Sequence, residues 1–180
     1  VAFPAGAEHP TTVLGDSRDD WRFHFFDCPG GSCRLDLPAD RVNYARAYAG
    51  RGGSFSTDRA AISGPSQSVA LVLPDFLHLD SPASGAVVEP GAVLAWRGPD
   101  ALTAAIVYGL GYRFEAYTSG KSVTLPDLGA VGLPWAKGAS LMASVVALPR
   151  GSLDALTDAD GGYPTWDANT QETVDFATAP

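Results

Sequence analysis

Turn-forming residues interrupt this chain along its whole length of 180 residues, which include 20 Gly and 14 Pro without a repeating period. Both residues destabilise helix interiors, Gly through backbone entropy and Pro through the loss of an N–H donor. Between them lie short apolar or alternating segments, with turn signals about 8–12 residues apart, as is typical of β-sandwiches. The sequence therefore predicts an all-β protein.

Four strands are predicted in the N-terminal part, one of which, Arg34–Leu37, is the hairpin partner of Trp21–Asp27. Trp21–Asp27 alternates like a strand, with its aromatic side chains shared between two faces. Arg41–Tyr48 also fits a short helix, but its alternation favours a strand. Ser68–Leu73 is an apolar segment that we expect to be a strand ended by Pro74.

The C-terminal part shows a cleaner series of strand patterns. They are the alternating pair Leu77 and Leu79, then Gly91–Trp96, Tyr112–Tyr117, Lys121–Leu125, Ser140–Leu148 and Glu172–Ala177. Ser140–Leu148 is the most apolar of them, which favours a core strand.

Several short motifs in this part resemble those of bacterial immunoglobulin-like (Ig-like) and fibronectin type III modules. They are Ser81-Pro82 with Gly85, Leu94-x-Trp96, Tyr112-x-Phe114-x-Ala116, Leu125-Pro126-x-Leu128 and Val145-x-Ala147. The resemblance implies a two-sheet sandwich with Trp96 in its core. Leu141 stands where such modules usually carry a tyrosine, so a tyrosine-corner hydrogen bond is not expected. Modules of this kind are mostly spacers, adaptors or binding scaffolds.

The expected organisation is two β units packed together. Residues 1–75 form an N-terminal β unit with a disulfide-stapled hairpin, and residues 76–180 form the Ig/fibronectin type III-like sandwich. The segment between Pro74 and Ser81 reads as a continuous strand, not a flexible linker, because apolar residues alternate along it.

Cys28 and Cys33, the only two cysteines, enclose Pro-Gly-Gly-Ser. This tight turn brings the two thiols within reach of a disulfide bond, which on the chain-entropy model adds about 2 kcal/mol for so short a loop. A disulfide indicates an oxidising compartment, so we expect an exported protein: periplasmic, cell-surface or extracellular. The chain begins at Val1 without Met, which we take to mean that a leader preceded it. One alternative is a metal site formed by His24, Cys28 and Cys33. The other is that both cysteines are free thiols.

The charge of the chain argues against two classes of partner. Twelve basic and 20 acidic residues give a net charge of −8. Nucleic acids and anionic membranes need a basic surface, so neither is an expected partner. No apolar run reaches the roughly 20 residues that span a bilayer, so no transmembrane segment is expected.

Residues for catalysis do not form a recognisable set. No Gly-x-Ser-x-Gly elbow occurs, and the three histidines His9, His24 and His78 lie in different contexts. His78 and Asp80 offer two metal ligands on one strand face, but no third ligand stands nearby in the sequence. We therefore expect a protein that is not an enzyme and needs no cofactor, with a hydrolase using an unrecognised site as an alternative.

An acidic stretch near the C-terminus is a candidate calcium site. Asp158 and Asp160 precede Gly161, and Asp167 stands where a twelve-residue calcium loop places its last carboxylate. Leu156 occupies the first ligand position and cannot coordinate a cation. An acidic surface turn is therefore the favoured interpretation, and a structural Ca²⁺ site is the alternative.

Aromatic residues in predicted loops are candidates for a binding platform. Trp135 lies in a Gly/Pro-rich loop, and Tyr163 and Trp166 flank Pro164. Flat rings of this kind stack on sugars or on apolar partner surfaces. The favoured alternative is that Trp135 and Trp166 cover the open end of the sandwich core. The leading hypothesis is a non-catalytic binding or structural module of a bacterial envelope or secreted assembly, with a protein or glycan partner at the cell surface. A carbohydrate-binding module using these three aromatics is the alternative.

Overall fold

The computed structural model describes residues 1–16, 19–26, 43–62, 68–109, 112–127, 132, 137–152, 154 and 168–179. The strands in these residues are β1 Glu8–Asp16, β2 Asp19–Phe26, β3 Asn43–Arg51, β4 Ser54–Ile62, β5 His78–Ser81, β6 Val87–Val88, β7 Val93–Arg97, β8 Leu102–Gly109, β9 Tyr112–Thr118, β10 Ser122–Thr124, β11 Ser140–Leu148 and β12 Ala168–Thr178. The strands form antiparallel sheets, which confirms the all-β prediction. No helix in the described residues is long and apolar enough to cross a membrane.

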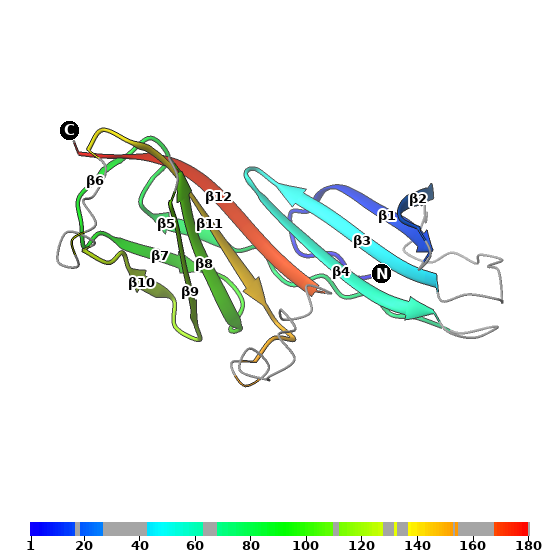
Figure 1. Cartoon of the computed structure of the whole chain (residues 1–180). Helices are drawn as coiled ribbons and strands as arrows, with labels where there is room; N and C mark the ends of the chain where they lie inside the picture. Colours follow the sequence, from blue (N-terminus) through cyan, green and yellow to red (C-terminus); the bar gives the residue numbers. More distant parts are fainter. Residues whose placement is uncertain are drawn as a thin grey trace.

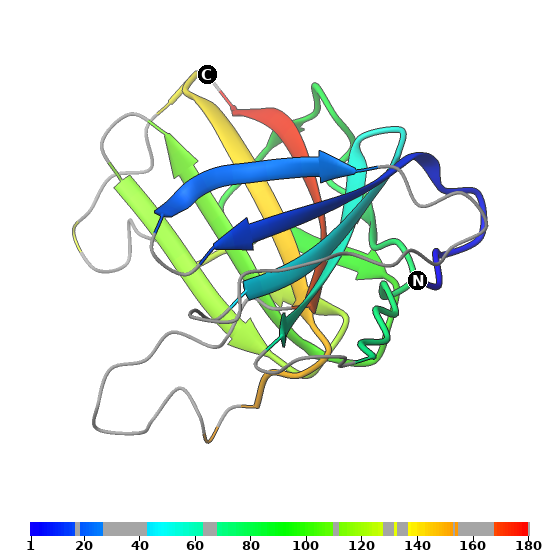
Figure 2. The same cartoon turned by 90° about the vertical axis from the view of Figure 1, so that its right-hand side faces the viewer.

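Two sheets build the molecule (Figure 1). A nine-stranded sheet has the order β2-β1-β3-β4-β12-β11-β8-β9, with β6 added to β12 as a parallel partner. A three-stranded sheet has the order β10-β7-β5. In Figure 2 the N-terminal strands of the large sheet lie in front of its C-terminal strands.

The main core lies between the small sheet and the C-terminal half of the large one. Leu94 and Trp96 of β7 meet the alternate residues Val107 of β8 and Leu141 and Val145 of β11, all buried. Trp96 is only 4% exposed, as expected of a core residue. Leu141 is buried in the same cluster, so the position where the resembled modules carry a tyrosine is filled by an aliphatic side chain.

A second core lies under the N-terminal half of the large sheet. Ala45, Ala47 and Ala49 point from β3 toward Leu71 and Leu73, which belong to the chain that runs on toward β5. Small alanine side chains on the strand let this passing backbone approach the sheet closely. The segment lies on the same side of the large sheet as the small sheet, since both pack on the inward-facing residues of β4 and β12.

Strand β12 joins the two halves. Its residues Thr170–Ala177 pair with β11, and its first five residues, Ala168–Glu172, also pair with β4. Figure 1 shows β12 (red) running beside both neighbours. The large sheet is therefore continuous across the expected boundary at residue 75, and the division of the chain into 1–75 and 76–180 stays a prediction.

The expected strands agree in part with the observed ones. Ser140–Leu148 has the predicted bounds, and Arg41–Tyr48 overlaps β3, as the strand interpretation required. The prediction of a strand over Ser68–Leu73 is wrong, because these residues lie outside the strands and Val72 makes only an isolated bridge with Ala2. The alternation that suggested a strand is real, since Leu71 and Leu73 are buried and Val72 is 60% exposed.

The connection from Pro74 to Ser81 is likewise not one continuous strand. Only His78–Ser81 is β5. The preceding backbone is held by side chains of the large sheet: Ser56 Oγ donates to the carbonyl of Pro74 at 2.7 Å, and Ser54 Oγ donates to that of Leu77 at 2.8 Å. The segment is thus fixed without strand pairing, because side chains supply the partners that a ladder would have supplied.

Candidate functional site

One face of the large sheet points away from the small sheet, and we call it the open face. Side chains alternate along a strand, so each strand contributes every second residue to it. On β8 the inward residues Ala105 and Val107 belong to the core, which leaves Ile106 and Tyr108 on the open face. On β11 the same alternation places Ser144 and Val146 there.

Tyrosines gather on this face. Every tyrosine whose side chain the structure describes belongs to it: Tyr44, Tyr48, Tyr108 and Tyr117. In the N-terminal half the guanidinium of Arg59 lies 3.7 Å from the ring centre of Tyr44, and Arg46 donates to the hydroxyl of Tyr48 at 3.1 Å. Such cation–π contacts hold the rings and the charges in fixed places.

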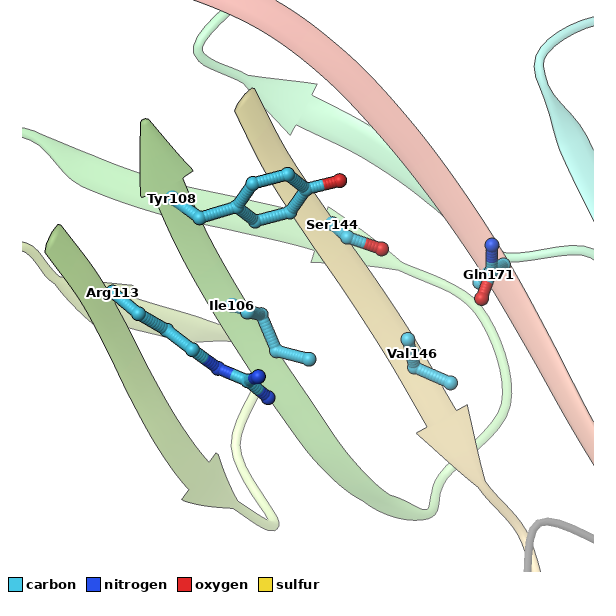
Figure 3. Close-up of a pocket in the computed structure, with 6 residues that line it drawn as sticks. All are labelled: Ile106, Tyr108, Arg113, Ser144, Val146 and Gln171. Atoms are coloured by element: carbon cyan, nitrogen blue, oxygen red, sulfur yellow. The ribbon is translucent and has the colours of Figure 1, made fainter. Parts of the chain in front are cut away.

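A shallow depression of about 390 Å³ lies on the C-terminal half of the open face (Figure 3). Its described lining comes from β8, β9, β11 and β12: Ile106, Tyr108, Arg113, Ser144, Val146 and Gln171. The pairing register explains why these residues meet. Tyr108 is paired with Arg113, Ile106 with Ser144 and Val146 with Gln171, so three neighbouring levels of the four strands contribute side chains to one depression.

The Tyr108 ring forms one wall of the depression. Figure 3 shows it lying across the sheet, with its hydroxyl directed from β8 toward β11. The hydroxyl is 2.7 Å from the sulfur of Met142, to which it donates, and the residue remains 40% exposed. The ring is therefore held at its far end while part of the residue stays open to solvent.

The charge of Arg113 is balanced within the open face. Its Nη2 lies 2.6 Å from Oε2 of Glu115, and the other carboxylate oxygen of Glu115 accepts from the hydroxyl of Tyr117 at 2.5 Å. Arg113 is the one charged residue among the described lining of the depression. The site thus offers N–H donors without a net charge.

The chemistry of the described lining suits binding. It combines an aromatic ring and two aliphatic side chains with a hydroxyl, an amide and a guanidinium. Ser144 Oγ accepts from Thr173 Oγ1 at 3.2 Å, and the described lining contains no histidine that could act as its base. These groups can stack on and hydrogen-bond to a ligand.

The site residues expected from the sequence lie outside the described residues, and they stay predictions. They are the disulfide pair Cys28 and Cys33, the aromatic platform Trp135, Tyr163 and Trp166, and the calcium ligands Asp158, Asp160 and Asp167. The open-face depression is a different site from all of these.

His78 and Asp80 are brought together with a third residue that the sequence did not indicate. His78 Nδ1 lies 3.2 Å from Oε2 of Glu172 on β12, and its Nε2 lies 3.7 Å from Oδ1 of Asp80. Glu172 also accepts from the backbone N–H of Leu79. Within the described part of the chain, no three His, Cys, Asp or Glu residues are placed to hold a metal ion, so this cluster ties β5 to β12.

Sequence reasoning missed the residues of the depression. Arg113 lies in a predicted alternating strand, which signalled the face that it shares with Tyr117 but not its neighbours on β8. Tyr108 carried no such signal because it ends an almost continuously apolar segment. Gln171 could be placed beside them only through the pairing of β12 with β11.

Comparisons with known proteins give no match: no family model, no curated protein and no solved structure resembles the chain significantly.

Proposed function

We propose that this protein is an exported, non-catalytic binding module that holds its partner on the open face of the large sheet. The observation that carries the proposal is the gathering of Tyr44, Tyr48, Tyr108 and Tyr117 on that face beside Arg46, Arg59 and Arg113. Tyr and Arg are the residues that most often dominate binding energies at interfaces, because they combine a large contact area with hydrogen bonding.

The order of the strands supports an Ig/fibronectin type III-like sandwich in the C-terminal part. In the lettering used for such sandwiches, β5, β7 and β10 of the small sheet are strands A, B and E. The short strand β6 is an addition after strand A. The large sheet continues as C′, C, F and G, namely β9, β8, β11 and β12. Ig-type sandwiches divide their strands between two sheets in this way. Such a scaffold leaves the outer face of its larger sheet for function.

Export is proposed on the strength of Cys28 and Cys33, since a disulfide forms and persists in an oxidising compartment. The net charge of −8 supports a partner other than nucleic acid. The partner class is then a protein or a glycan of the bacterial envelope or of a secreted assembly.

Retention on envelope material tests the proposal. The purified chain is mixed with cell-wall and outer-membrane fractions of the organism that encodes it, and the bound fraction is measured. A variant with Phe55→Ser and Tyr108→Ser removes two exposed rings of the open face. We expect this variant to lose most of the retention.

The matched control carries Val72→Ser and Val93→Ser, which remove two exposed apolar side chains outside the open face. Its retention is expected to equal that of the unaltered chain. Equal retention of the two variants, or no retention of the unaltered chain, would contradict the proposal. Circular dichroism confirms that both variants are folded.

A further inference from the structure

We infer that the depression around Tyr108 binds an uncharged oligosaccharide, an inference that rests on the proposed function and names the ligand class. Sugars present apolar C–H faces and many hydroxyl groups, so a sugar site needs a flat ring beside neutral donors and acceptors. The depression brings these groups together from four strands.

Tyr108 supplies the stacking surface. The residue is 40% exposed, and its hydroxyl donates to the sulfur of Met142. A ring anchored at both ends loses little conformational freedom when a ligand covers it, which favours binding. Ile106 extends the apolar surface beside it, and Val146, which is only 2% exposed, forms part of the floor (Figure 3).

The polar groups around the ring favour a neutral ligand. Ser144 and Gln171 each offer a donor and an acceptor, and Arg113 offers N–H groups. An acidic ligand would have to compete with Glu115 for Arg113, since these two side chains are 2.6 Å apart. Hydroxyl groups can share the guanidinium without breaking that ion pair, because a guanidinium has five donors.

The dimensions of the site suit a short segment of a longer chain. A volume of about 390 Å³ is at the lower end of the range for small-ligand sites. The depression is open on its solvent side, and the pairing register leads from Gln171 to Phe55, a further exposed ring on β4. A glycan can therefore continue from the depression along the open face toward the N-terminal half.

The test is a calorimetric titration of the purified full chain with uncharged oligosaccharides of hexose and N-acetylhexosamine. We expect at least one of them to bind. Tyr108→Ala should weaken that binding at least about tenfold, whereas Tyr108→Phe, which keeps the ring, should stay within about threefold. Gln171→Ala should weaken it about threefold or more, and the control Val93→Ala should leave it unchanged.

Salt dependence distinguishes neutral from acidic ligands. Binding of an uncharged glycan should have the same affinity at about 50 mM and about 500 mM NaCl, because there is no ligand charge to screen. The inference is overturned if only uronic or sulfated glycans bind, if Tyr108→Ala and Tyr108→Phe are equally affected, or if no neutral glycan binds at millimolar concentration.

The two proposals fail in different ways. In one outcome, retention on envelope material depends on Phe55 and Tyr108 but no neutral glycan binds. The binding function then stands, and the ligand class is refuted. Glycan binding by the purified chain that is indifferent to Tyr108 would remove the depression as the site, whatever the retention experiment shows.

Discussion

Asp58 connects parts of the chain that are distant in sequence. Its side chain is fully buried on β4. One carboxylate oxygen accepts from the N–H of Arg59 and the other from the N–H of Val72, both at 2.8 Å. Arg150, at the end of β11, places Nη1 3.0 Å from the same carboxylate. One acidic residue thus accepts a hydrogen bond from the segment that precedes β5 and forms an ion pair with an arginine from the other half of the molecule.

Replacing Asp58 by Ala is expected to lower the free energy of unfolding by about 3 kcal/mol, because the fully buried carboxylate no longer binds the N–H of Val72 and the guanidinium of Arg150. Urea unfolding followed by circular dichroism measures the change. Asp100→Ala is the control, since Asp100 pairs with Lys121 at 2.9 Å but is fully exposed. An Asp58→Ala midpoint no lower than that of the control would contradict the role given to Asp58.

At the scale of elements, the segment from Pro74 to Leu77, which leads into β5, is held by side chains of β4 and β12. Besides the serine contacts, the N–H of Leu77 donates to Thr170 Oγ1 at 3.0 Å, and both groups are buried. These contacts replace the backbone ladder that an ordinary strand would form. The segment is therefore sensitive to substitutions that leave every strand intact.

Thr170→Val keeps the shape of the side chain and removes the acceptor for Leu77. We expect a loss of about 1–3 kcal/mol, the cost of a buried N–H left without a partner. Amide hydrogen exchange should show faster exchange at Leu77, with the β8 and β11 amides little changed. Thr124→Val, at an exposed position of β10, serves as the control, and equal exchange at Leu77 in both variants would refute the assignment.

The same elements show what the sequence could and could not predict. Alternating strands with one apolar face, such as β9, and the apolar β11 were found from their patterns. Strand β4 was missed because its inward residues Ser54, Ser56 and Asp58 are polar, which reverses the usual pattern. They are polar because they bind a passing backbone, and no local pattern reveals that partner.

Strand β8 was missed for a different reason. Leu102–Gly109 lies between β11 and β9, and its residues are buried on both faces over most of its length. A strand of this kind shows a continuous apolar run without alternation. The open-face site depends on β8 and on the pairing of distant strands, so its lining could not be assembled from the sequence.

At the scale of the whole molecule, the continuous sheet makes the two halves depend on each other. Each half has its own core, but β12 contributes hydrogen bonds to both. If either half unfolds, a strand of the other half loses its neighbour, because β4 and β12 are paired with each other. Cooperative unfolding of the whole sheet follows from this arrangement.

We predict that Leu94→Ala, in the core of the C-terminal half, lowers the stability of both halves together. Leu94 is fully buried, so the substitution should cost about 3 kcal/mol. In urea, the amides of Ala47 on β3 and Ala143 on β11 should lose protection from hydrogen exchange with one midpoint, and the variant should shift both equally. Two separate midpoints, with only that of Ala143 moved, would show that the halves unfold independently.

The position of β12 also determines how the molecule responds to mechanical force. β12 is the last of the described strands, antiparallel to both β11 and β4, with β6 as a parallel partner near its end. A pull on the residues that follow Thr178 acts along the axis of β12, so the hydrogen bonds to these neighbours are loaded in shear and must break together. A peeling geometry would let them break one at a time. A chain pulled at this end is therefore expected to resist extension with the large sheet intact.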